Sequence, residues 1–343
     1  MHTIVFVHKK KILPEATIMK KTLLKGTLVN VAISDIDLKP GPCCMSYHFN
    51  LEPLKASIEK LGVINPPYLL KDPDNNFLVV AGYQRLMAVK ELGWQGIFCH
   101  ILPDSFSLFD ALLFNLNDNL LHRQLNNIEK GMILKRLTQF IPADEIVTNF
   151  TSILGIPSNN QQLALFLGLE DLEERIKIPV AMEQLSIRVA GLLKHLEKND
   201  RLAISDLFTT LKWSNNQQWE AIHWIKEIAS RAGRPIKEII DSKDIKGILE
   251  NTTMNKPQKA KTILKLLKYR RFPTLSKAEK LFNKRISNLS LPLGVKIIPP
   301  PFFEGADYKL EVIFRKGEDL KGKLVDLNNV ADLNNITNFW KGV

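Results

Sequence analysis

The chain has 343 residues, a net charge of +11, 45% hydrophobic residues and 24% charged residues. The proportions are typical of a globular protein, and the length is enough for two or three domains. No apolar run approaches the roughly 20 residues of a membrane-spanning helix, which excludes a helical membrane protein. The three cysteines, Cys43, Cys44 and Cys99, cannot form a paired disulfide framework and favour a reduced cytoplasm.

The N-terminal third of the chain predicts alternating strands and helices. Residues 1–28 are expected to be a flexible leader, with Met19 as an alternative start. The elements expected next are a strand at Val29–Ile33, a helix at Leu51–Leu61, a hairpin of Tyr68–Lys71 with Phe77–Ala81, a helix after Gly82 and a strand at Gly96–Leu102. Together they predict a small α/β unit.

The segment Val79–Trp94 indicates an anion site. Its sequence is typical of a buried strand end, a glycine turn at Gly82 and a helix with Arg85 in its first turn. Free backbone N–H groups, the helix dipole and a cation would then meet at one point, which suits a phosphate. The alternative is a tight turn without a ligand, in which Gly82 serves only the backbone.

From Ser107 to about Asp241 the pattern is almost entirely helical. Within this region, Asp144–Leu154 and Asn159–Leu169 flank a glycine turn and fit a helix-turn-helix, with Ser158 as the expected cap of the second helix. A helical hairpin inside a bundle is the alternative. The polar residues that open the second helix could contact bases, since Asn and Gln pair with adenine in the major groove; they are Ser158, Asn159, Asn160, Gln161 and Gln162.

The positive charge is concentrated near the C-terminus. Residues 256–285 contain eleven Lys or Arg residues and one acid, Glu279, a net charge of +10. This density favours nucleic acid over an anionic membrane surface, an acidic protein or a merely solvated helix face. The candidate phosphate contacts are Lys261, Lys265, Lys268, Arg270 and Arg271. Two strands around a Pro/aromatic loop and a short helix from Gly317 are expected to follow.

Four stretches in this order resemble boxes of the ParB family of chromosome- and plasmid-partition proteins. They are Glu52–Pro66, Ala81–Ala88 (AGYQRLMA), Asp118–Glu129 (DNLLHRQLNNIE) and the helix-turn-helix position Ile146–Leu169. The resemblance covers roughly residues 29–240 and leaves the C-terminal hundred residues outside it.

This resemblance implies an α+β multidomain protein. Its parts would be a leader (1–28), a small α/β ParB-like domain (29–125), an all-helical helix-turn-helix domain (126–245) and a small basic α/β C-terminal region (246–343). The family binds CTP with Mg²⁺ in the first domain and a specific DNA site in the second. The resemblance thus implies a DNA-binding protein that acts in chromosome or plasmid partition or in transcription control and is regulated by CTP. The implied partners of this chain are double-stranded DNA, a second copy of the chain and a partition ATPase, and no membrane. The implied location is the cytoplasm, at the nucleoid.

The residues that match the family's boxes give the candidate nucleotide site. Those implied to bind nucleotide are Gly82, Gln84, Arg85, Asn119, His122 and Arg123, and those implied to bind Mg²⁺ are Asp118 and Asn119. Gln84, Met87 and His122 stand where the family has Arg. At about 1.5–3 kcal/mol for each charge-assisted hydrogen bond, these substitutions argue against efficient hydrolysis and leave at most a weak CTPase.

Two further functions fit the same ParB-like domain. Older annotation names it a nuclease and some relatives transfer phosphate, so the chain could be a nucleotide hydrolase, a phosphotransferase or a nuclease. It could equally be a degenerate scaffold that keeps the fold and binds no nucleotide.

Overall fold

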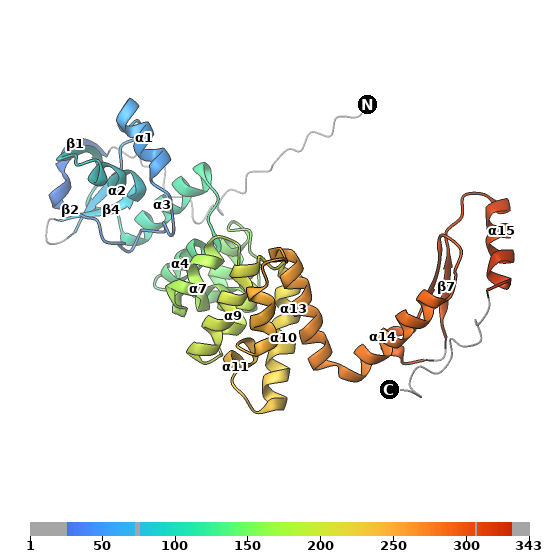
Figure 1. Cartoon of the computed structure of the whole chain (residues 1–343). Helices are drawn as coiled ribbons and strands as arrows, with labels where there is room; N and C mark the ends of the chain where they lie inside the picture. Colours follow the sequence, from blue (N-terminus) through green and yellow to red (C-terminus); the bar gives the residue numbers. More distant parts are fainter. Residues whose placement is uncertain (1–25, 73–75, 306, 331–343) are drawn as a thin grey trace. The chain divides into compact units, whose positions relative to one another are not determined.

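The computed structural model describes residues 26–72, 76–305 and 307–330 (Figure 1). It confirms the α+β class, with an N-terminal mixed sheet, a largely helical middle and a small C-terminal hairpin with one helix. The chain divides between Thr210 and Leu211 into two compact units. Most of the predicted leader lies outside the described residues, and the first strand begins at Thr27, inside the range predicted for that leader.

The first unit is built on a five-stranded sheet of order β1-β5-β3-β4-β2. Its strands are β1 (Thr27–Ala32), β2 (Ile36–Asp37), β3 (Tyr68–Lys71), β4 (Phe77–Ala81) and β5 (Gly96–Ile101). The predicted β3–β4 hairpin is confirmed as an antiparallel pair, β1 pairs antiparallel with β5, and β3 pairs parallel with β5. A short 3₁₀ turn, η2 (Ile33–Asp35), leads into β2, which pairs parallel with β4.

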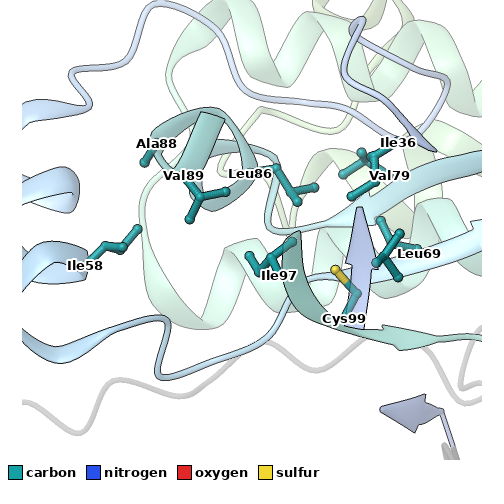
Figure 2. Packing of buried hydrophobic residues seen from close by; sticks show 10 residues of the cluster. Ile36, Ile58, Leu69, Val79, Leu86, Ala88, Val89, Ile97 and Cys99 are labelled. Atoms are coloured by element: carbon teal, nitrogen blue, oxygen red, sulfur yellow. The ribbon is translucent and has the colours of Figure 1, made fainter. Parts of the chain in front are cut away.

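Two helices pack on one face of this sheet, α1 (Glu52–Leu61) and α2 (Tyr83–Glu91). Figure 2 shows the shared core, in which Leu86 and Val89 of α2 face Val79 of β4 and Ile97 of β5. All four side chains are at most 3% exposed. On the other face, Leu70 and Val80 pack with Cys43 and Ala111. The turn at Gly82 therefore connects a buried strand to a helix whose position is fixed by core packing.

The three cysteines are buried structural residues. Each is at most 1% exposed, and burial raises the pKa of Cys43 and of Cys99 to about 12. Burial therefore disfavours the thiolate of these cysteines at pH 8, and the thiolate is the reactive form. We expect the folded protein to resist a thiol reagent at pH 8 and to react fully in denaturant, as followed by absorbance. Rapid labelling of the folded protein would contradict this assignment.

Helices make up the rest of the first unit. They are α3 (Leu108–His122), α4 (Asn127–Leu137), α5 (Ala143–Ile146), the π-helix η3 (Val147–Thr151), α6 (Asn160–Leu167), the 3₁₀-helix η4 (Gly168–Asp171), α7 (Glu174–Ala181), α8 (Ile187–Leu193) and α9 (Lys198–Leu211). α5 with η3, the turn at Gly155 and α6 form the expected two-helix arrangement. Gly155 has a φ of 70°, which suits the end of the first helix.

The predicted serine cap of α6 is wrong. Asn159 caps this helix, and its side chain accepts a hydrogen bond from the backbone N–H of Gln162 at 2.9 Å. The hydroxyl of Ser158 instead accepts a 2.9 Å hydrogen bond from the hydroxyl of buried Thr151. Ser158 therefore ties the turn to the preceding helix.

A glycine allows α4 and α6 to pack closely. A Cβ at Gly131 would lie 2.7 Å from the backbone carbonyl oxygen of Phe166, so the helices would have to separate. We expect Gly131→Ala to lower the free energy of unfolding by about 1–3 kcal/mol in urea titrations. Gly247→Ala is the matched control, because Gly247 lies inside a helix with no atom near its added Cβ, and it should be neutral or stabilising. Equal stabilities for the two variants would contradict the proposed clash.

In the described residues of the second unit, five helices are followed by a hairpin and one further helix. They are α10 (Asn215–Ala232), α11 (Ile236–Ile240), α12 (Lys243–Glu250), α13 (Lys256–Arg271), α14 (Pro273–Asn288), β6 (Val295–Ile298), the 3₁₀ turn η5 (Pro301–Phe303), β7 (Lys309–Val312) and α15 (Gly317–Asn328). The predicted hairpin and short final helix are confirmed. Phe282 of α14 packs on Phe303 of η5, with ring centroids 5.5 Å apart. None of the helices in the described ranges is both long and apolar enough to cross a membrane.

Candidate functional site

A cavity of about 550 Å³ lies in the first unit beside the N-terminus of α2. It is lined by α2, the end of α1, the segment before β3 and the C-terminal half of α3. All seven residues predicted for the nucleotide and metal site line it: Gly82, Gln84, Arg85, Asp118, Asn119, His122 and Arg123. Gly82 and Arg123, which are 41 positions apart in sequence, are thus brought to one place.

Gly82 shapes the floor of this cavity. It adopts a left-handed conformation (φ 91°, ψ 22°) at the start of α2 and accepts the first helical hydrogen bond, from the N–H of Leu86. A Cβ here would lie 3.0 Å from the Cβ of Pro67 and 3.1 Å from the Nε of Arg85. Glycine is therefore required both by the left-handed turn and by the lack of room for a Cβ beside the guanidinium. The first N–H groups of α2 at this point suit an anion.

Arg85 is held in place at the cavity wall. Its guanidinium donates a hydrogen bond to the backbone carbonyl of Asn65, and its Nη2 lies 3.9 Å from Oδ2 of Asp118. Burial lowers the pKa of Arg85, and the neighbouring carboxylate of Asp118 opposes this effect. A guanidinium nevertheless stays protonated in proteins, so Arg85 supplies a fixed positive charge.

Asp118 and His122 lie one turn apart on α3 at the edge of the cavity. Nδ1 of His122 lies 2.7 Å from the backbone oxygen of Asp118 and 3.5 Å from its carboxylate. The His122 side chain is 67% exposed, whereas that of Asp118 is 30% exposed. His122 therefore stands at the rim, and the carboxylate of Asp118 faces both Arg85 and His122.

Arg123 and Asn119 are bound to each other. Nε of Arg123 donates to Oδ1 of Asn119 at 2.7 Å, and Nη1 donates to Glu129, whose side chain is 2% exposed, at 2.7 Å. The third nitrogen of Arg123, Nη2, is buried and has no hydrogen-bond partner among the described residues. The amide of Asn119 also donates to the backbone oxygen of Asn115. Both ends of the Asn119 amide are thus engaged in hydrogen bonds. Of the two predicted Mg²⁺ ligands, Asp118 is therefore the one whose side-chain oxygens line the cavity without a hydrogen bond from another described residue.

Two residues that position the site were not among the sequence candidates. Glu129 also accepts hydrogen bonds from the backbone N–H of Asn126, at 2.9 Å, and of Tyr47, at 3.1 Å. The Tyr47 hydroxyl donates to Glu174 of α7 at 2.6 Å, and Asn126 donates to the Tyr47 carbonyl. The signal for Glu129 was present, since Asn126 and Glu129 form a capping box at the start of α4. The role of Tyr47 had no local signal.

The electrostatics of the cavity are nearly balanced. Arg85 faces Asp118, and Arg123 is paired with Glu129. A polyanion would therefore gain from the α2 N-terminus and from Arg85, but it would meet the carboxylate of Asp118. Among the described residues, no group of three or more His, Cys, Asp or Glu side chains could hold a metal ion. A cation would need ligand oxygens in addition to Asp118.

The predicted DNA-contacting residues lie in both units. At the start of α6, Asn160 and Gln161 are exposed, Gln162 is half-buried, and Ser158 and Asn159 make the hydrogen bonds described above. On α13, Lys261 and Lys265 are exposed. The other three cations are paired: Lys268 with Glu279 at 2.8 Å, Arg270 with Asp244 at 2.7 Å, and Arg271 with Glu227.

Comparison with known proteins finds similarity to ParB proteins and to the related nucleoid occlusion proteins. The ParB N-terminal domain matches residues 18–116. The probable chromosome-partitioning protein ParB of Campylobacter jejuni is 29% identical over 217 residues, which cover 62% of this chain and 74% of that protein. The ParB of Vibrio cholerae is 26% identical over 55% of this chain and 63% of its own length. The nucleoid occlusion protein of Bacillus mycoides is 26% identical over 40% of this chain, and the match spans about half of that protein, 51%.

Two solved structures are also similar in part. A C-terminally truncated ParB from Caulobacter crescentus, complexed with CTP-γ-S, is 20% identical with a TM-score of 0.25 and covers 53% of this chain and 99% of that one. The C2221 form of a Pnob8-like ParB-N domain is 16% identical with a TM-score of 0.34 and covers 71% of this chain and 97% of that one. Residues 18–116 thus match the ParB N-terminal domain, and the chain is a distant homologue of the ParB and nucleoid occlusion proteins.

Proposed function

We propose that the chain is a DNA-binding partition protein whose N-terminal cavity binds a nucleoside triphosphate, with CTP as the first candidate, together with Mg²⁺. The observation that carries the proposal is the convergence of all seven predicted nucleotide-site residues on one cavity. These residues come from a turn and from two helices that are separate in sequence, so local structure alone does not bring them together.

The chemistry of the cavity supports a phosphate ligand. The α2 N-terminus begins at the left-handed Gly82, Arg85 lies directly beside it, and Nη2 of Arg123 is a buried donor without a partner. An unsatisfied buried donor is unfavourable, and a phosphate oxygen would satisfy it after a movement of the guanidinium that exposes Nη2 to the cavity. The backbone donors and the two guanidinium groups together suit a chain of phosphates.

Asp118 supports the metal part of the proposal. Mg²⁺ is commonly held by one or two carboxylates together with substrate phosphates. Bound at Asp118, it would supply positive charge between this carboxylate and the phosphates, which would otherwise repel each other. Nucleotide binding should therefore depend on Mg²⁺.

The helix-turn-helix and the family support the DNA-binding part. Asn160 and Gln161 are exposed at the start of α6, where a recognition helix contacts bases. The relatives are named for chromosome partitioning and nucleoid occlusion, roles that bring a protein to DNA. The exposed Lys261 and Lys265 of α13 would add phosphate contacts. A homodimer and a partition ATPase as partner stay predictions from the resemblance.

The proposal is tested by calorimetric titration of the purified chain with CTP and ATP, with and without Mg²⁺ and duplex DNA. We expect Mg²⁺-dependent heat with CTP and an affinity that changes when DNA is present. Release of inorganic phosphate, measured in the same samples, distinguishes a binding switch from a hydrolase. No heat with either nucleotide would leave the scaffold alternative, and no binding to any duplex at low salt would overturn the DNA-binding function.

A further inference from the structure

Helix α14 carries a row of exposed lysines along one side. Lys277, Lys280 and Lys284 are spaced three and four residues apart, so they lie on one face of the helix. All three are exposed, and no ion pair or hydrogen bond between described residues uses their ammonium groups. The opposite side of α14 is packed, with Ala278 fully buried and Phe282 5% exposed against Phe303. The lysine row is therefore a surface on a well-anchored helix.

The neighbouring helix α13 uses its cations differently. Lys268, Arg270 and Arg271 are paired with acidic side chains of other helices, and Lys259 donates to the carbonyl of Leu249. Much of the charge of α13 thus joins helices to one another. Lys261 and Lys265 of α13 remain exposed, and a row of three exposed lysines lies on α14, which the sequence candidates did not include.

The dimensions of this row fit a phosphate backbone. Lys277 and Lys284 are seven residues apart, which is about 10 Å along a helix. One strand of duplex DNA carries a phosphate for every 3.4 Å or so of its axis, so a row of this length faces about three phosphates. Lysine ammonium groups on flexible stems can follow such a row without a fixed pairing geometry.

Other anionic partners fit this surface less well. A helix that binds a membrane surface presents large apolar residues beside its basic face, but the apolar side of α14 is turned inward and no residue of α14 is among the exposed large hydrophobic residues of the described chain. An acidic protein would add an apolar core to its interface, and the lysine row offers none.

We propose that Lys277, Lys280 and Lys284 form a further, sequence-independent contact with the backbone of duplex DNA, in addition to α6 and to the two exposed lysines of α13. This inference rests on the proposed DNA-binding function and names the surface of the second unit that takes part in it. It predicts that affinity for any duplex depends on salt through these three side chains.

The test compares three versions of the full chain on a duplex of random sequence between 50 and 200 mM salt. They are the wild type, the triple variant Lys277→Gln, Lys280→Gln and Lys284→Gln, and a control triple variant Lys226→Gln, Lys309→Gln and Lys321→Gln. The control removes the same charge from exposed positions on three different elements. Circular dichroism and thermal unfolding check that all three proteins are folded.

We plot the logarithm of the binding constant against the logarithm of the salt concentration. The slope is expected to be shallower by about 2.7 for the α14 variant only. Over this salt range the wild type should therefore lose about 40-fold more affinity than the α14 variant. If the wild type binds duplex DNA but the α14 and control variants have equal slopes, the lysine row is not a DNA contact. That outcome would overturn this proposal and leave the DNA-binding function standing. A wild type that binds no duplex at 50 mM salt would overturn both.

Discussion

Replacing Arg85 with alanine is expected to weaken Mg²⁺–CTP binding by about 10- to 150-fold, because one charge-assisted hydrogen bond contributes about 1.5–3 kcal/mol. Arg85 is the cation that lies directly beside Gly82 at the α2 N-terminus. Its loss would also leave Asp118 without its positive neighbour, which would increase the repulsion of phosphate. Calorimetric titration of the variant with CTP measures the change.

Lys90→Ala is the matched control for this experiment. Lys90 lies on the same helix, α2, is exposed and does not line the cavity, so its removal deletes the same charge at a distance from the site. We expect it to bind nucleotide like the wild type. If Arg85→Ala binds as tightly as Lys90→Ala, phosphate does not sit beside Arg85 and the assigned site is wrong.

Glu129→Ala is expected to lower the free energy of unfolding by about 1–3 kcal/mol, since it leaves the half-buried guanidinium of Arg123 and two backbone N–H groups without their partner. The carboxylate is 2% exposed and is bonded to Arg123, to Asn126 and to the backbone of Tyr47. Urea unfolding of the chain without nucleotide measures this effect. Glu59→Ala, which removes an exposed carboxylate of α1, should change stability by less than about 0.5 kcal/mol. A Glu129 variant as stable as the Glu59 variant would show that this network does not contribute to folding.

The elements that follow from local pattern were predictable. The β3–β4 hairpin, the turn at Gly82 and the helix after it arise from short apolar runs, the turn residues between them and a glycine that can adopt positive φ. Of the site, Gly82 and Arg85 could be linked by their spacing alone. Asp118, Asn119 and Arg123 could be assigned only through the family resemblance, because no local rule places α3 beside α2.

Features that depend on distant partners were not predictable. Ser158 and Asn159 are both good helix caps, and the choice between them depends on Thr151, which engages Ser158 from the preceding helix. The charge count over residues 256–285 likewise cannot reveal that Arg270 is paired with Asp244 and Arg271 with Glu227, because these acids lie 26 and 44 residues earlier. Packing of the helices decides which cations remain available.

The hydrogen bonds of Tyr47 indicate where the chain could be shortened without losing the contacts of the first unit. Tyr47 precedes α1, yet its partners Asn126, Glu129 and Glu174 all follow residue 125. A fragment ending at 125 would lack these three partners and would leave Arg123 without its carboxylate. A fragment ending near Thr210 retains every one of these bonds, which makes it the natural minimal piece for biophysical study of the cavity.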